Sequence, residues 1–129
     1  MVEETHLPVR AFKSAWFAKA AKKSRIGDDE LCDAIKQVMQ GKADDLGGGV
    51  YKKRLNGNMH RSIVLARGGR YWVYEYLFAK KDRDNIEDAE LAAFRTLAKG
   101  YAALAEKQIK QMLQDNLLME ICHDNKTKI

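Results

Sequence analysis

The stretch VYKKRLNGNMHRSIVLARGGRYWVYEYLF, residues 50–78, decides the fold. Its β-branched and aromatic residues favour strands, and two short turn signals divide it into three segments. The turns Asn56-Gly57 and Gly68-Gly69 are typical of two-residue hairpins. We therefore expect three consecutive antiparallel strands, over Val50–Leu55, Met59–Arg67 and Arg70–Phe78.

Helical patterns precede these strands. A short edge strand over Val9–Phe12 leads into a helix over Lys13–Ser24, where apolar residues recur at helical spacing. A second helix begins at Asp28 or Asp29, either of which can act as its N-cap. Lys42–Gly49 is expected to be a loop, and its three consecutive glycines permit unusual dihedral angles or a close backbone approach.

Helical patterns also follow the strands. A long helix begins within Asp84–Asp88, and Ala105–Gln114 either continues it or forms a separate helix. Leu117–Ile121 is a short apolar run and a candidate last strand. Helices, an antiparallel sheet and further helices in this order predict an α+β domain, with a twisted antiparallel sheet, N-terminal helices and a C-terminal helix.

The totals are those of one globular domain. The chain has 129 residues, of which 46% are hydrophobic and 32% charged, and its net charge is +5. We expect one domain over residues 1–129 with its core at about 9–122. The positive charge fits an acidic partner.

Cysteine usage and hydropathy predict a cytoplasmic protein. No apolar run is long enough to span a bilayer, and the polar start of the chain lacks the apolar centre of a signal peptide. Cys32 and Cys122 have neither metal-site nor framework spacing, so we expect two reduced thiols. Cys122-His123 is not metal-site spacing either, and we expect no metal or other cofactor.

The two hairpins place several cations on one face of the sheet. With tight turns, Lys52 lies opposite Arg61, and Arg61 lies opposite Tyr76. Lys52, Arg54 and Arg61 then share a face with four rings, Trp72, Tyr74, Tyr76 and Phe78. Such a face suits RNA, because cations bind phosphate and rings stack on unpaired bases. In the alternative reading, Trp72 and Tyr74 belong to the core and the cations are solvated strand ends.

A second basic segment, Lys80-Lys81-Asp82-Arg83, follows the third strand and could close one end of the same patch. Its alternative is a solvated loop with weak local ion pairs. His60 precedes Arg61, so in a regular strand it points to the opposite face, as does Glu75. His60 could be a general base only if the strand is irregular.

Three groups of residues together resemble the RelE/HigB-type toxins of bacterial toxin–antitoxin modules. The first runs from Leu46 to Arg54 and is followed by Arg61, and the second runs from Phe78 to Ile86. Lys13–Lys19 and the helix around Leu91–Leu104 agree with one compact branch of that superfamily. The resemblance covers roughly residues 10–122 and implies a fold like that of microbial ribonucleases.

The resemblance also implies an activity. Many members cleave mRNA in the ribosome without a metal, through attack of the 2′-hydroxyl on the adjacent phosphorus. The basic positions matched by motif are Lys52, Arg54, Arg61, and Lys81 or Arg83 beside it. Arg61 would stabilise the phosphoryl oxygens, and Arg54 would position the backbone. Lys52 would act as the base, since a lysine crowded by cations loses its proton more readily.

Further roles follow from the same comparison. Lys81 or Arg83 would stabilise the leaving oxygen, and the additional RNA-binding residues would be Lys53, Tyr76, Phe78 and Lys80. Some relatives carry a tyrosine shortly after the basic turn, where this chain has Ile86-Glu87. The partners implied are a helix-turn-helix antitoxin, the ribosome and mRNA, in the bacterial cytoplasm and without a membrane. Two alternatives stay open: a ParE-like toxin that targets gyrase, and a non-catalytic nucleic-acid-binding regulator.

Overall fold

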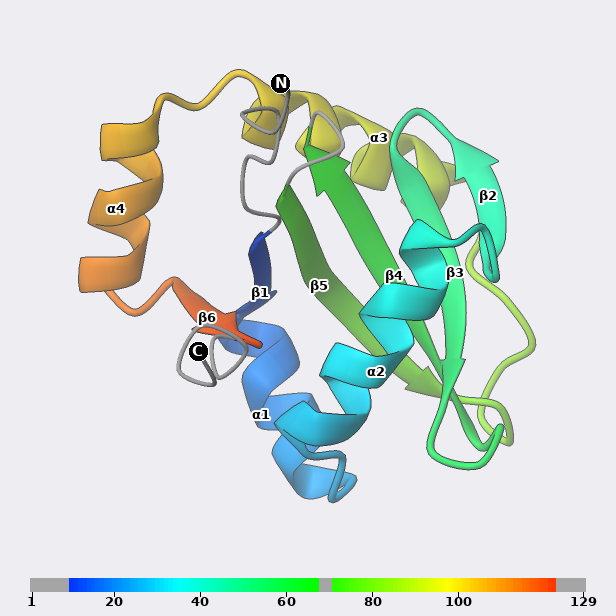
Figure 1. Ribbon diagram of the computed structural model, residues 1–129. Helices are drawn as coiled ribbons and strands as arrows, with labels where there is room; N and C mark the ends of the chain where they lie inside the picture. The colour runs from blue at the N-terminus through cyan, green and yellow to red at the C-terminus, as the bar shows by residue number, and fades with distance from the viewer. Residues whose placement is uncertain (1–9, 68–70, 123–129) are drawn as a thin grey trace, which may run out of the picture.

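The computed structural model describes residues 10–67 and 71–122. Over these residues the chain forms an α+β fold with a six-stranded sheet and four helices (Figure 1). The elements in chain order are β1 (Arg10–Ser14), α1 (Ala15–Lys23), α2 (Asp28–Met39), β2 (Asp44–Gly47), β3 (Val50–Leu55), β4 (His60–Arg67), β5 (Tyr71–Ala79), α3 (Asp88–Ala102), α4 (Glu106–Gln114) and β6 (Leu118–Ile121). The expected α+β class is confirmed. No helix in the described part of the chain is long and apolar enough to cross a membrane.

The sheet order is β2-β3-β4-β5-β1-β6. The strands β3, β4 and β5 form the expected antiparallel meander, whereas β1 lies parallel to β5. The first strand was expected at an edge, but β6 pairs beside it, so β1 lies inside the sheet. The expected loop over Lys42–Gly49 contains β2, which adds the opposite edge.

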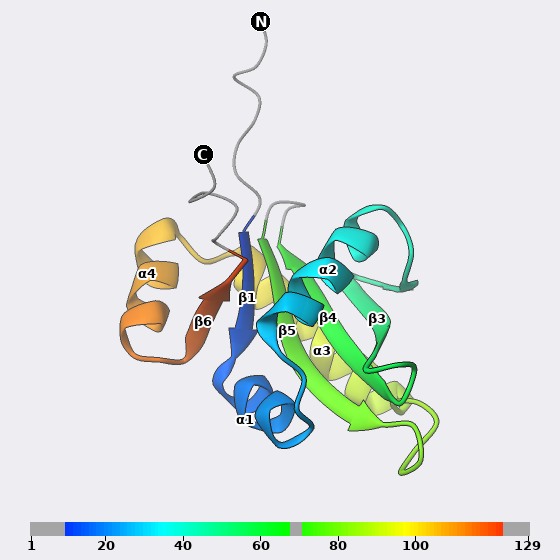
Figure 2. The same ribbon diagram turned by 60° about the horizontal axis from the view of Figure 1, so that its bottom comes forward.

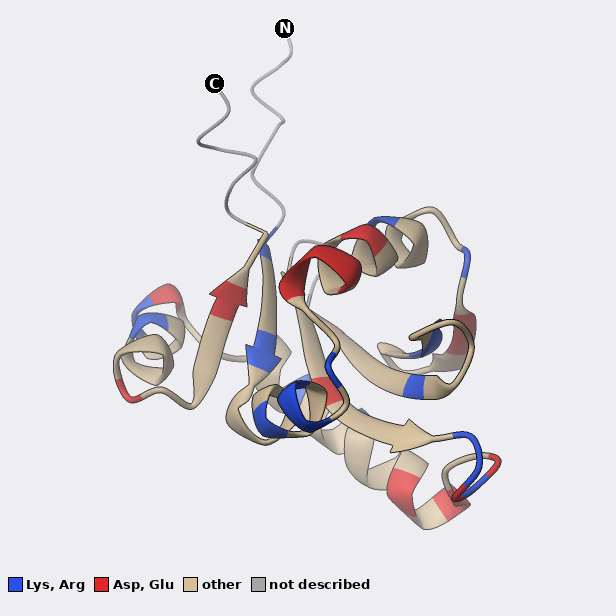
Figure 3. Cartoon of the chain, turned by 90° about the horizontal axis from the view of Figure 1, so that it is seen from below, with Lys and Arg blue, Asp and Glu red and all other residues tan. Residues whose placement is uncertain are grey.

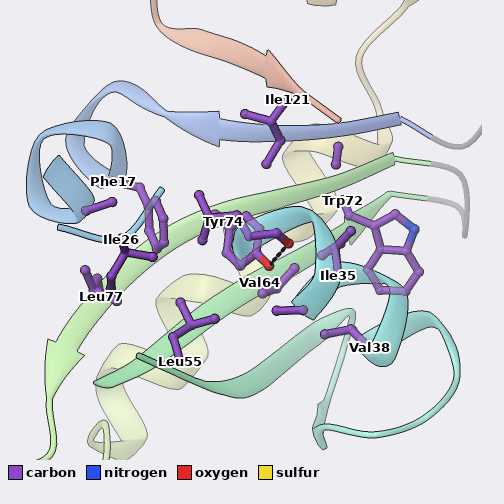
Figure 4. Close-up of a cluster of buried hydrophobic side chains, with 14 residues drawn as sticks. Phe17, Ile26, Ile35, Val38, Leu55, Val64, Trp72, Tyr74, Leu77 and Ile121 are labelled. Carbon is purple, nitrogen blue, oxygen red and sulfur yellow. Dashed lines mark hydrogen bonds between the residues drawn. The ribbon is translucent and has the colours of Figure 1, made fainter. Parts of the chain in front are cut away.

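The helices cover the two faces of the sheet separately (Figure 2). On one face, α1 and α2 bury a cluster that includes Phe17, Leu31 and Tyr74. The Tyr74 hydroxyl donates to the Leu31 carbonyl at 2.7 Å, as the dashed line in Figure 4 shows, and its ring stacks on Phe17. We call this the α1–α2 face. The opposite face, the α3 face, packs against α3 and α4 around Ile63 and Tyr101.

The β3–β4 connection is two residues longer than predicted. Leu55 pairs with His60 and Arg54 with Arg61, so the loop comprises residues 56–59. Asn56, Gly57 and Asn58 all have positive φ, between 56° and 73°, which Asn and Gly adopt most readily. The expected pairing of Lys52 with Arg61 is therefore wrong, because Lys52 pairs with Ile63. Since a shift of two residues preserves the faces, Lys52, Arg54 and Arg61 still lie on one side.

A β-bulge at Glu75 divides the aromatic strand β5 between the two faces. Val64 pairs with Tyr74, but Ile63 pairs with Tyr76. The extra residue reverses the alternation, so Trp72 and Tyr74 are buried on the α1–α2 face while Tyr76 faces α3. The expectation that Trp72 and Tyr74 share the face of the cations is wrong, and the alternative that they belong to the core is correct. The Gly68-Gly69 turn lies outside the described residues, but the pairing on either side of it shows that the expected register is wrong: Arg67 pairs with Tyr71, and Arg61 pairs with Phe78 instead of Tyr76.

Because of the bulge, Glu75 lies on a different face of the sheet from the one expected. Its carboxylate was expected on the face opposite the cations, but it accepts a hydrogen bond of 3.1 Å from the Tyr101 hydroxyl of α3. Burial raises the pKa of Glu75 and also that of Tyr101. Glu75 therefore helps to hold α3 against the sheet.

The two cysteines form a disulfide, contrary to the expectation of two reduced thiols. Cys32 of α2 is bonded to Cys122, which directly follows β6, with 5.5 Å between the Cα atoms. Their sequence separation of 90 gave no local spacing signal. Only the docking of β6 beside β1 brings Cys122 to α2. The bond links the last strand to the α1–α2 layer.

The glycine triplet allows α3 to approach the β2–β3 turn. Arg95 of α3 donates hydrogen bonds to the carbonyls of Leu46 and Gly47. A Cβ atom at Gly48, where φ is +65°, would lie 2.8 Å from Cγ of Arg95. Larger residues would therefore displace Arg95, and the expected close backbone approach is confirmed.

Candidate active site

Three of the predicted cations lie together on the α3 face, near the β3–β4 loop. They are Lys52, Arg54 and Arg61. Arg54 of β3 lies opposite Arg61 of β4, and Arg61 lies opposite Phe78 of β5. Lys52 lies one step inward, beside Ile63. Opposed strand residues have Cβ atoms about 4.5–5.5 Å apart, so the Arg54–Arg61 pair concentrates positive charge.

The loop from β5 to α3 brings a fourth cation to this place. The Nε atom of Arg83 donates to the Asn85 carbonyl at 3.0 Å, and its guanidinium carbon lies 5.5 Å from the centre of the Phe78 ring. The side-chain oxygen of Asn85 accepts from Nζ of Lys52 at 3.2 Å. Asn85 thus connects the cations of β3 with the loop. We call Lys52, Arg54, Arg61 and Arg83 the basic cluster.

The members of the basic cluster differ in their partners. Arg83 forms an ion pair with Glu90 of α3 that includes a 3.1 Å hydrogen bond. This pairing raises the pKa of Arg83, and it holds the pKa of Glu90 below its usual value. Lys52 has the weaker neighbour Asp44, with 3.7 Å between Nζ and the carboxylate. Glu90 therefore compensates the charge of Arg83, and Asp44 compensates that of Lys52.

Arg54 and Arg61 have no such compensation. Within the described residues, neither guanidinium forms an ion pair with a carboxylate. Nη1 of Arg61 donates to the carbonyls of Asn58 and His60, at 3.0 and 3.2 Å, which fixes the direction of the side chain. Arg54 is exposed and Arg61 is half-buried. A pair of arginines held in this way presents donors and charge to an anion such as phosphate.

The other predicted RNA-binding residues are dispersed. Lys53 lies on the α1–α2 face and donates to the Lys42 carbonyl at 3.1 Å, and burial lowers its pKa. Lys80 and Lys81 are exposed on the turn after β5. Together with Met59 of the β3–β4 loop they line a cleft of about 640 Å³. The sheet register thus separates Lys53 from the basic cluster.

The two predicted stacking rings differ in access. Phe78 is only 6% exposed and lies beneath Arg83, so it supports the guanidinium and offers no open surface to a base. Tyr76 is half-buried, and its hydroxyl accepts from Arg83 at 3.4 Å. Its ring stacks on Trp16 of α1, with 5.0 Å between the ring centres.

The strand is regular at His60, as the face assignment requires. His60 pairs with Leu55 and Ala79, on the face opposite Arg61. Its Nδ1 atom lies 3.1 Å from the side-chain nitrogen of Asn56. The condition for its use as a general base beside Arg61, an irregular strand, is not met.

Sequence reasoning missed two residues of this region. Asn85 lies within the Phe78–Ile86 stretch that carried the family resemblance, but an amide in a polar loop gives no signal of its own. Trp16 was assigned to the apolar side of its helix, yet it is 51% exposed. Its neighbour Phe17 is fully buried, and adjacent helical residues point in different directions. Two adjacent aromatic residues could therefore have indicated that one of them faces outward.

One of three comparisons with known proteins gave a match. A family model described as the RelE toxin of the RelE/RelB toxin–antitoxin system matches residues 9–121. No significant match was found among curated proteins or among solved structures. The matched segment includes every strand, every helix and the whole basic cluster that the structure describes. The chain belongs to the RelE toxin family of toxin–antitoxin systems.

Proposed function

We propose that this toxin is an endoribonuclease that cleaves mRNA on the ribosome, with the basic cluster as its active site. The observation that carries the proposal is the Arg54–Arg61 pair, two adjacent guanidinium groups without a carboxylate partner among the described residues. Members of the family are generally endoribonucleases that inhibit translation, and such a pair suits the charge of a phosphodiester.

The proposed reaction needs no metal. The 2′-oxygen of a ribose forms a bond to the adjacent phosphorus while the bond from phosphorus to the 5′-oxygen breaks. The products are a 2′,3′-cyclic phosphate and a 5′-hydroxyl. Negative charge grows on the phosphoryl oxygens in the transition state, and fixed donors lower its free energy. Arg61 is the proposed donor to these oxygens, and Arg54 binds the neighbouring backbone.

Lys52 is the proposed base that removes the 2′-hydroxyl proton. The ammonium formed by this transfer would be stabilised by Asp44, whose carboxylate lies 3.7 Å from Nζ. Asn85 would orient the side chain through its 3.2 Å hydrogen bond. Asn85 thus becomes a positioning residue of the proposed site.

The leaving 5′-oxygen needs a proton at the other end of the reacting group. Lys81 is the proposed donor, because it is exposed on the turn next to the basic cluster and an ammonium can give up a proton. Arg83 is already bound to Glu90 and is a poorer acid, so its proposed role is to stabilise charge. Lys53, Lys80, Tyr76 and Phe78 would contribute to RNA binding around this centre, Phe78 by supporting Arg83.

The family also implies an antitoxin partner. We propose that it is a helix-turn-helix protein and that it covers or flanks the basic cluster. The ribosome is the second proposed partner, because its RNA suits a basic surface. We propose the bacterial cytoplasm as the place of action because the proposed partner, the ribosome, works there, and not because of the cysteines, which form a disulfide.

The test is primer extension on translated mRNA after brief induction of the toxin. New 5′ ends within codons are expected for the wild-type chain and not for Arg61→Ala. The charge-matched control, Lys107→Ala on α4, should cleave like wild type. Growth arrest without new ends would overturn the proposal in favour of a gyrase-directed toxin. Neither arrest nor ends would favour a non-catalytic binding protein.

A further inference from the structure

A basic groove lies beside the proposed active site, along the exposed edge of β5. The strand β1 pairs with β5 only as far as Tyr74, so residues 75–79 extend beyond it. The helix α1 borders this part of β5 on one side, and the turn at residues 80–83 borders it on the other. The space between them is a groove of about 640 Å³. In Figure 3 the basic parts of α1 and of this turn are blue.

Trp16 supplies an aromatic surface to this groove. Trp16 is 51% exposed, although a tryptophan is costly to leave in water. One side of the indole is stacked on Tyr76, with an interplanar angle of 27°. Tyr76 is in turn braced by Phe78 and Phe94, with ring centres 6.0 and 5.8 Å away. Trp16 is thus held at a fixed angle with about half of its surface uncovered.

The charges that line the groove are mostly positive. Lys19 and Lys23 of α1 lie on one wall, and Lys81 and Arg83 lie on the other, against the single carboxylate of Asp82 among the described lining residues. Lys19, Lys23 and Lys81 are exposed. Cations on both sides of an exposed ring are the elements with which proteins bind single-stranded nucleic acid.

We propose that this groove binds the segment of single-stranded RNA that flanks the cleaved bond, with one base stacked on Trp16. The inference rests on the proposed function and extends it from the reacting phosphate to a neighbouring nucleotide. Arg83 connects the two places, since it belongs to the basic cluster, lines the groove and donates to Tyr76 beneath Trp16. RNA leaving the cluster past Arg83 enters the groove.

RNA fits these observations better than an acidic peptide does. Every base has a flat π-face for the uncovered side of Trp16, whereas a carboxylate gains nothing from an indole face. Cations on two opposite walls suit a backbone with a phosphate at each nucleotide. Continuity with the basic cluster also favours one ligand over both places.

The first test measures binding of a fully 2′-O-methylated 12-nucleotide RNA, which lacks the 2′-hydroxyl needed for cleavage. Its binding should quench tryptophan fluorescence, because Trp16 is exposed while Trp72 is 7% exposed. Fluorescence anisotropy of the labelled oligonucleotide gives the affinity. Trp16→Ala should weaken binding about 5- to 150-fold, and Trp16→Phe should weaken it less. Leu117→Ala, also at an exposed apolar residue, is the matched control and should bind like wild type.

The second test follows the lysines. For single strands, each neutralised phosphate contributes about 0.7 to the slope of log affinity against log salt concentration. Lys19→Ala with Lys23→Ala should therefore lower the slope by about 1.4. The control variant Lys107→Ala with Lys110→Ala should leave it unchanged.

The outcomes separate this inference from the proposed function. Wild-type affinity in Trp16→Ala would overturn the groove even if Arg61→Ala abolishes cleavage. Undiminished cleavage by Arg61→Ala would overturn the proposed active site, while loss of affinity in Trp16→Ala would still support an RNA-binding groove. Quenching by a polyglutamate peptide but not by the oligonucleotide would overturn the groove as an RNA site and assign it to a protein partner.

Discussion

The two ends of the sheet use arginine in opposite ways. At one end, Arg10 of β1 forms a bidentate pair with Glu120 of β6, with N–O distances of 2.9 and 2.8 Å, and Glu106 lies 3.7 Å away. At the other end, Arg54 and Arg61 face each other without a carboxylate partner in the described structure. A cation that stabilises a fold is neutralised by that fold. Uncompensated cations on neighbouring strands cost stability and indicate an anion from outside.

The packing around the arginines follows the same division. Arg10 also lies over the rings of Phe12 and Tyr71, at 5.2 and 5.5 Å, and its pairing with Glu120 raises its pKa. Among the described residues, Arg61 is held by hydrogen bonds to the carbonyls of Asn58 and His60 and by no carboxylate. The contacts of Arg10 link the strands β1 and β6. Those of Arg61 fix the direction of its side chain. Changing each arginine should therefore affect different properties.

The largest expected effect is the loss of cleavage in Arg61→Ala. Removal of one donor to a developing oxyanion typically lowers a rate by about 10²- to 10³-fold. The free energy of unfolding should fall little, since no carboxylate is left unpaired. Cleavage rates of translated mRNA and urea unfolding of the same preparations give the two values. If the loss of cleavage is explained by a matching fall in the folded fraction, Arg61 is a structural residue.

The second effect concerns the disulfide, which braces the Arg10 end through β6. Reduction of Cys32–Cys122 opens the loop between two cysteines with a sequence separation of 90, and such a bond typically contributes about 2–4 kcal/mol. Urea unfolding with and without a reductant measures the change. Cys32→Ser with Cys122→Ser should match the reduced protein and be insensitive to reductant. An unchanged unfolding midpoint would mean that β6 docks without this bond.

The third effect is the converse of the first. Arg10→Ala removes the two charge-assisted hydrogen bonds from Arg10 to the partly buried carboxylate of Glu120, so stability should fall by about 1–3 kcal/mol. Cleavage by the folded fraction should remain close to wild type. Arg10→Ala with Glu120→Ala should recover part of the stability, which a double-mutant cycle in urea would measure. A loss of cleavage in fully folded Arg10→Ala would contradict the assignment of stability to the Arg10 end of the sheet and of cleavage to the Arg54–Arg61 end.

The smallest effect is the pH dependence of the Arg83–Glu90 pair. The hydrogen bond from Arg83 lowers the pKa of Glu90 below its ordinary value of 4.5. A lowered folded-state pKa contributes stability above pH 4.5, and this contribution is lost as the pH falls through the folded-state pKa. The difference in unfolding free energy between wild type and Glu90→Gln should thus shrink as the medium becomes acidic. A difference that stays constant from pH 6 to pH 3 would contradict the pairing.

Local sequence signals predicted the helices and strands. A register error of two residues did not change which side chains share a face of the sheet. The strand Val50–Leu55 was predicted with its observed bounds. The β3–β4 loop was predicted two residues too short, yet Arg54 and Arg61 still share a face because side chains alternate with a period of two. The cations of the site could therefore be grouped correctly from a wrong register.

Register changes of one residue, and contacts between residues far apart in the sequence, could not be predicted. The β4–β5 pairing is shifted by one residue from that of a two-residue turn, since Arg67 pairs with Tyr71, and this shift places Trp72 and Tyr74 on the other face. The bulge at Glu75 then returns Tyr76 and Phe78 to the face of the cations, and an alternating aromatic strand gives no sign of one extra residue. Cys32 meets Cys122 only after β6 has docked. The role of Asn85 depends on a loop that crosses the sheet to reach Lys52. Each of these features is set by tertiary packing.

The most direct test of the central claim is an end-group analysis of mRNA cut during reconstituted translation with purified toxin and its Arg61→Ala variant. The proposed reaction predicts upstream fragments that end in a 2′,3′-cyclic phosphate and downstream fragments with a 5′-hydroxyl. These fragments should fall by about 10²- to 10³-fold in the variant. Fragments with 5′-phosphate ends, or equal cleavage by both proteins, would contradict an active site built from the uncompensated arginines.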